Sequence, residues 1–117
     1  MAESLTFQEI VDKTLDVIRK FKDVETREWG AEGCVIELSK QVGDLSKQVM
    51  SFEGYYDIGR DSLPEYQSSK EKIANELADI LFILIKLADH YKIDLEEAHL
   101  KELDIALNHP FMKLKKK

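Results

Sequence analysis

An uninterrupted apolar run at residues 80–85 (Ile-Leu-Phe-Ile-Leu-Ile) restricts the possible folds of this chain more than any other segment. It lies inside a periodic stretch that begins at a capping-box motif, Ser68 to Glu71, so we predict a helix over residues 68–91. Such a helix is apolar around most of its circumference and needs cover on all sides. A chain of 117 residues offers few elements to supply it, which predicts self-association into a dimer or tetramer.

The rest of the chain also has helical patterns. We predict helices over residues 6–21, 32–51 and 94–109, because Thr6 and Asp94 each begin a capping motif and apolar residues in 32–51 recur at spacings of three and four. No stretch alternates apolar and polar residues as a strand does. The prediction is therefore an all-α, four-helix bundle-type domain over residues 1–112, completed by oligomerisation, with a lysine-rich solvated tail at 113–117.

Composition excludes several classes of partner. The 23 acidic and 17 basic residues give a net charge of −6, which disfavours nucleic-acid or anionic-membrane binding. No apolar run reaches the roughly 18 residues of a membrane span. The single cysteine, Cys34, cannot form an internal disulfide and is expected to be a buried structural thiol; the start of the chain does not resemble a signal peptide. We expect a cytoplasmic protein.

Two acids of the helix over 68–91 are the first candidates for chemistry. At 100° per residue Glu76 points with the apolar face, and Asp79 lies on its edge. A buried unpaired carboxylate is costly unless its pKa shifts, or it meets a cation or a metal. The alternative is that both acids lie on a solvated rim or pair with a lysine, including one from another chain.

A second polar stripe favours the metal interpretation. Glu37, Gln41 and Asp44 share one face of the helix over 32–51, and they would meet Glu76 and Asp79 if the two helices are antiparallel neighbours. Oxygen ligands of this kind suit magnesium, or manganese, rather than zinc. The three histidines lack metal-ligand spacing and are expected on the surface or at helix ends.

Three segments together resemble a known family. They are Gln41-Val-Gly-Asp44-Leu45, then Asn75-Glu76-Leu-Ala-Asp79-Ile-Leu-Phe, then Lys92-Ile-Asp94-Leu-Glu-Glu-Ala98. This order is similar to that of the all-α nucleoside triphosphate pyrophosphohydrolases, the MazG-like and dCTP pyrophosphatase group. The resemblance extends over roughly residues 5 to 110.

The resemblance implies hydrolysis of a nucleoside triphosphate between its α and β phosphates, giving the monophosphate and pyrophosphate, with magnesium as cofactor, in nucleotide clean-up. By position it implies that Asp44, Glu76 and Asp79 hold the metal, together with Gln41. It also implies that Trp29 lies near the base. From helical geometry Glu37 is our candidate to orient the attacking water, with Asp44 as the second catalytic candidate.

The chain departs from the family pattern at several positions. Gln41 replaces a metal-binding glutamate, Asp44 is one methylene shorter than the usual residue, and Ala106 stands near a phosphate-contacting asparagine. Lys101 is the lysine closest to the expected phosphate contact. The alternative is a non-catalytic homologue that binds a nucleotide or another protein. For Trp29 the alternative is a hydrophobic plug at the end of the bundle, and base preference is expected in the loop at 52–68 or in another subunit.

Overall fold

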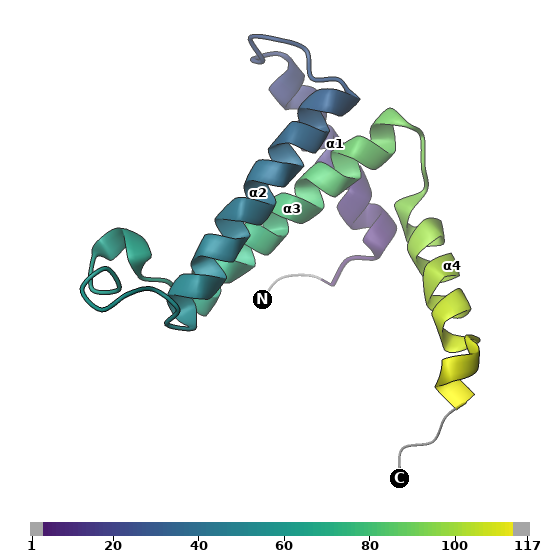
Figure 1. Ribbon diagram of the computed structural model, residues 1–117. Coiled ribbons are helices and arrows are strands. Elements are labelled where there is room, and N and C mark those ends of the chain that lie inside the picture. Colours follow the sequence, from purple (N-terminus) through teal and green to yellow (C-terminus); the bar gives the residue numbers. More distant parts are fainter. Residues whose placement is uncertain (1–3, 114–117) are drawn as a thin grey trace.

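Four α-helices and two short 3₁₀ helices make up the secondary structure of residues 4–113, the part of the chain that this computed structural model describes (Figure 1). They are α1 (Phe7–Lys22), α2 (Ala31–Phe52), η1 (Pro64–Tyr66), α3 (Lys70–His90), α4 (Leu95–Leu107) and η2 (Pro110–Lys113). The all-α prediction is confirmed. The predicted tail falls outside the described residues from position 114 onward.

Local side-chain caps set the helix starts. Thr6 Oγ1 accepts a hydrogen bond from the backbone N–H of Glu9 at 3.1 Å, and Glu9 Oε1 accepts one from the Thr6 N–H at 3.0 Å. Asp94 caps α4 with a single bond, in which its side chain accepts from the N–H of Glu97 at 3.0 Å. Each cap satisfies an N–H that has no partner inside the helix. The predicted starts of α1 and α4 are confirmed.

The predicted start of α3 at Ser68 is wrong by one residue. Ser69 is the cap, with an extended backbone and a side chain that accepts from the N–H of Lys72 at 3.2 Å. A capping box needs an acidic or amide side chain three residues after the cap, and Lys72 holds that place. Ser69 therefore caps α3 alone, without the return bond that the Ser68 to Glu71 pairing suggested.

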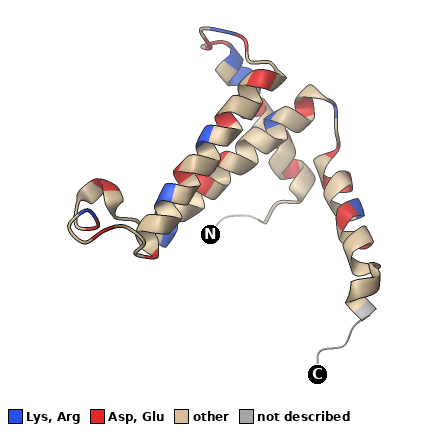
Figure 2. Ribbon diagram, viewed as in Figure 1, with Lys and Arg blue, Asp and Glu red and all other residues tan. Residues whose placement is uncertain are grey.

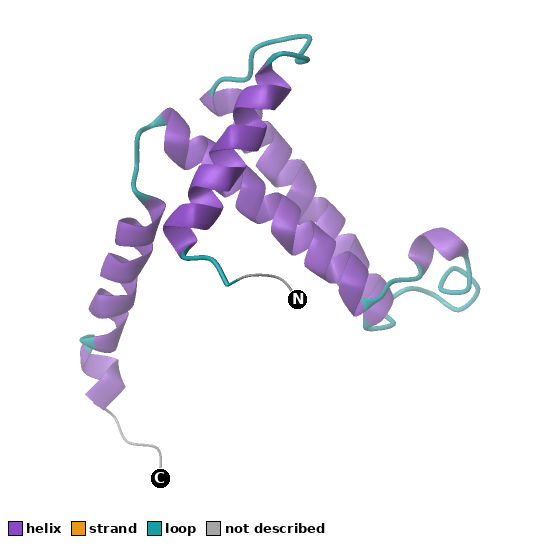
Figure 3. Cartoon of the chain, turned by 180° about the vertical axis from the view of Figure 1, so that it is seen from behind, coloured by secondary structure: helices purple, strands orange, loops and turns teal. Residues whose placement is uncertain are grey.

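Helices α2 and α3 run antiparallel and side by side along most of their length, and α1 packs across α3 (Figures 1 and 3). Among the described residues, the buried apolar side chains are Ile18, Cys34, Ile83, Ile85 and Ala88. Burial raises the pKa of the Cys34 thiol, as expected for a structural cysteine. None of the helices in the described part combines the length and hydropathy needed to cross a membrane.

The apolar run of α3 is only partly covered within one chain. Ile83 and Ile85 are buried, but Leu81 and Leu84 are each 38% exposed and Leu77 is 53% exposed. Helix α4 extends away from the α2–α3 pair (Figure 1), and the chain measures 57 × 47 × 36 Å along its principal axes. A single chain therefore leaves much of its apolar surface in contact with water.

Candidate functional site

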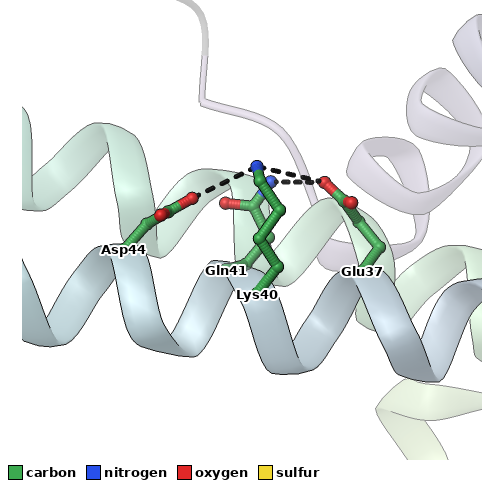
Figure 4. A network of polar contacts seen from close by, with 4 residues as sticks. All are labelled: Glu37, Lys40, Gln41 and Asp44. Carbon is green, nitrogen blue, oxygen red and sulfur yellow. Dashed lines mark hydrogen bonds and ion pairs between the residues drawn. The ribbon is translucent and has the colours of Figure 1, made fainter.

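The polar stripe of α2 forms one connected network (Figure 4). The Gln41 side-chain amide donates a hydrogen bond to Glu37 Oε1 at 3.0 Å. Lys40 Nζ lies 3.3 Å from Asp44 Oδ2 and 3.8 Å from Glu37 Oε1. Glu37, Gln41 and Asp44 are all half-buried. The structure thus brings the three predicted residues together and adds Lys40 to them. Lys40 lies three residues after Glu37 and four before Asp44, so helical spacing places it on the same face of α2.

Glu76 of α3 faces this network with an unsatisfied oxygen. Its Oε2 atom is shielded from solvent and has no hydrogen-bond partner. Burial, followed by the negative charges of Asp44 and Asp79, raises the pKa of the Glu76 carboxyl, while the charge of Lys40 lowers it. Carboxylates of the two helices are therefore close enough to repel one another, and Glu76 does not lie on a solvated rim.

Asp79 lies at the border of a pocket of about 410 Å³ between α2, α3 and the α1–α2 connection. Glu37 and Gln41 also line this pocket. The remaining lining is largely apolar and aromatic, with contributions from Phe21, Val24, Trp29, Phe82 and Ile83. One pocket therefore combines acidic and aromatic lining residues, an arrangement typical of small-molecule sites.

Two charged residues of the pocket were missed by sequence reasoning as site residues. Lys86 Nζ lies 3.2 Å from Glu25 Oε1 and 4.4 Å from the centre of the Trp29 ring. The signal was available, because Lys86 directly follows the apolar run and a cation there needs a partner. Trp29 lines the pocket next to Lys86 and is 38% exposed.

Other expected residues lie elsewhere. Lys101 is exposed on α4 and does not line the pocket. The loop after α2 lies at the far end of the α2–α3 pair from the α1–α2 connection (Figures 1 and 3), where Tyr56 and Tyr66 pack edge to face. Within one chain neither Lys101 nor this loop contributes to the pocket. The three histidines, His90, His99 and His109, are exposed, as expected.

The donor set fits a hard cation in part. Within residues 4–113 no three His, Cys, Asp or Glu side chains converge as a metal-binding group. Magnesium, however, is usually held by one or two carboxylates, with waters and substrate phosphates completing its shell. The buried oxygen of Glu76 lacks a partner, and Asp44 and Asp79 raise the negative charge around it. These residues suit magnesium bound together with a phosphate ligand better than a closed protein cage.

Comparison with known proteins adds one relative. The chain is 32% identical over 95 residues to the uncharacterized protein YvdC of Bacillus subtilis, an alignment that spans 73% of this chain and 86% of the relative. No model of a known protein family matches the chain. No solved structure is significantly similar to it.

Proposed function

The chain belongs to the family of Bacillus subtilis YvdC, and we propose that it is a magnesium-dependent nucleoside triphosphate pyrophosphohydrolase of the MazG-like type. The reaction would release pyrophosphate and a nucleoside monophosphate, in a cytoplasmic clean-up role. The single, buried Cys34 is consistent with a reducing compartment.

The observation that carries the proposal is the buried oxygen of Glu76, which has no partner and faces Asp44 and Asp79. A carboxylate oxygen that is shielded from solvent and lacks a hydrogen bond costs free energy that a bound cation would recover. The adjoining pocket of about 410 Å³, lined by Trp29, Phe82 and Glu37, has room for a base next to the acids. A nucleotide bound through a metal needs acidic ligands for the metal and a pocket for its base, and the unpaired Glu76 oxygen and the adjoining pocket support these two roles.

In this proposal Asp44, Glu76 and Asp79 hold the metal and the Gln41 amide oxygen assists them. Magnesium bound there would neutralise the phosphate charge and polarise the phosphorus centre that water attacks. Glu37 would orient the attacking water, with Asp44 as the second candidate for that role. The aromatic side of the pocket would position the base, and therefore the reacting phosphate, relative to these acids.

The test is incubation with a panel of nucleoside triphosphates and magnesium, followed by detection of pyrophosphate. We expect release from at least one substrate and loss of release in Glu76→Ala. Glu71→Ala is a matched control, because Glu71 is an exposed acid on the first turn of the same helix. No release from any nucleotide by a folded protein, or full turnover in Glu76→Ala, would contradict the proposal.

The alternative is a homologue that binds nucleotide without cleaving it. It is favoured by the internal contacts of the site, since Lys40 already pairs with Asp44 and Gln41 already bonds to Glu37. Thermal denaturation distinguishes the two: nucleotide alone would raise the melting temperature of a non-catalytic binder, and magnesium alone would not. For the enzyme we expect magnesium alone to raise it.

We further propose that the active form is a homodimer or homotetramer. The chain exposes 9663 Å², whereas a compact chain of this mass exposes about 6,500 Å². The excess of about 3,000 Å² is sufficient for a stable dimer interface, which buries roughly 1,200 to 2,000 Å² in total. A partner subunit could also bring Lys101, or the loop after α2, to the pocket.

A further inference from the structure

Lys40 forms ion pairs with two carboxylates of the candidate site. Its ammonium contacts Asp44 at 3.3 Å and lies 3.8 Å from Glu37, between the two acids (Figure 4). It also acts on Glu76 across the helix interface, where its positive charge opposes the effect of Asp44 and Asp79. One ammonium therefore serves acids from both helices of the site.

The side chain of Lys40 is free to leave this position. It is 63% exposed, and its partners in the described part are carboxylates on its own helix, one turn away in each direction. Exposed pairs of this kind contribute little to stability, so breaking them costs little. A lysine head group is a mobile point charge on a flexible stem, and its ammonium binds phosphate as readily as carboxylate.

We propose that Lys40 is the internal counter-ion of this site, which neutralises Asp44 and Glu37 when no metal is bound and turns to the substrate phosphates when a metal takes over these carboxylates. The inference rests on the proposed function. Lys40 is a substrate-binding residue in this scheme, supplied by the same helix as Asp44 and Glu37.

The two roles have opposite consequences for binding. Without Lys40 a metal no longer competes with an ammonium, so Lys40→Met should bind magnesium alone about two- to fivefold more tightly than the unaltered protein. The same variant lacks a charged hydrogen bond to phosphate, so it should bind a non-hydrolysable triphosphate analogue with magnesium about tenfold more weakly. A residue with only a structural role would not shift the two affinities in opposite directions.

Isothermal titration calorimetry measures both affinities directly. Lys47→Met is the matched control, because Lys47 is on the same helix two turns further on, and its ammonium lies 5.1 Å from the Tyr66 ring centre. This control removes the same positive charge at a distance from the site. Its affinities for magnesium and for the triphosphate analogue should change only as far as the change in net charge requires. Lys40→Arg should restore both affinities, since it keeps the positive charge.

Opposite shifts in Lys40→Met, absent in Lys47→Met, would support the inference. Shifts in the same direction, equal shifts in the two variants, or no shift would overturn it. Circular dichroism checks that each variant is folded, and Lys40→Gln provides a second removal of the charge. These binding results are separate from pyrophosphate release by the unaltered protein, so failure of the proposed activity and failure of the Lys40 role are distinguishable.

Discussion

Lys86 on α3 donates a hydrogen bond of 3.2 Å to Glu25, which lies 61 residues earlier in the chain. The other ion pairs in the described part of the chain join residues only three or four positions apart. Both side chains are largely covered, at 12% and 15% exposure. This pair therefore ties the α1–α2 connection to the last two turns of α3.

Breaking this pair should destabilise the protein. Lys86→Met leaves Glu25 charged and mostly covered, so we expect the free energy of unfolding in urea to fall by about 1 to 3 kcal/mol. Lys20→Met is the control, because Lys20 pairs with Asp16 at 3.5 Å on an exposed face, where the loss should stay below about 0.5 kcal/mol. Equal losses in the two variants would show that the Lys86 pair is no more important than a surface pair.

Gln41→Glu should lower the stability of the metal-free protein and raise its affinity for magnesium. The new carboxylate loses the hydrogen bond that Gln41 donates to Glu37 and repels that acid. We expect a lower melting temperature without magnesium, and magnesium binding about tenfold tighter by calorimetry, since one more charged ligand faces the cation.

Gln8→Glu makes the same chemical change away from the site. Gln8 donates a hydrogen bond of 2.9 Å to Asp12, four residues along α1. This control should lose a similar small amount of stability and gain no magnesium affinity. If both variants gain affinity equally, the effect is one of net charge and the assignment of Gln41 to the metal site is wrong.

Glu76→Gln should reveal the cost of the buried carboxylate. Because the pKa of Glu76 is raised above its ordinary value of 4.5 in the folded chain, ionised Glu76 destabilises the metal-free protein. This cost is absent when the pH is well below 4.5. It grows as the pH rises through the pKa that Glu76 has in the folded chain, and it is constant at higher pH. The melting temperature of the variant, relative to that of the unaltered protein, should therefore rise as the pH rises above the ordinary value of 4.5.

Magnesium provides the second measurement on Glu76→Gln. Magnesium should raise the melting temperature of the unaltered protein. The difference in melting temperature between Glu76→Gln and the unaltered protein at neutral pH should therefore become smaller. Turnover should fall at least about 100-fold, since even outer-shell partners of a metal cost 10- to 100-fold when altered. If the difference in melting temperature between the two proteins does not vary with pH, ionised Glu76 does not destabilise the metal-free protein.

Leu107→Glu should weaken self-association. Leu100, Leu103 and Leu107 follow one face of α4 at helical spacing and are 59%, 46% and 67% exposed. Sedimentation velocity should show a dimer or tetramer for the unaltered protein and a smaller species for the variant. Lys101→Glu, on another side of α4, should retain the larger species. A monomeric unaltered protein at micromolar concentration would rule out the proposed assembly.

The helices were predictable because their signals are local. Apolar periods and the caps at Thr6 and Asp94 depend on neighbours within a turn, and they located three helix starts to within about one residue. The same locality placed Glu37, Gln41 and Asp44 on one face. Ser69 was missed as the cap of α3 because the capping-box motif favours its neighbour Ser68, and only the backbone conformation shows which serine is the cap.

The pocket could not be predicted in the same way. Its aromatic side depends on the α1–α2 connection folding over α3, which requires contacts such as that between Phe21 and Phe82, whose ring centres are 6.2 Å apart. No local pattern encodes a contact of this sequence separation. The position of Lys101 outside the pocket of its own chain was not predictable for a related reason, because the direction of α4 follows from the turn after α3, where Lys92 adopts a left-handed φ of 56°.

Helix α4 has 13 residues and a single side-chain cap at its start, and it projects away from the α2–α3 pair (Figure 2). Isolated helices shorter than about 12 to 15 residues are marginal in water. Its backbone amides should therefore exchange with deuterium quickly in dilute protein and slowly once a second chain covers it. Helix α4 would then be stably folded only at protein concentrations at which the chains associate.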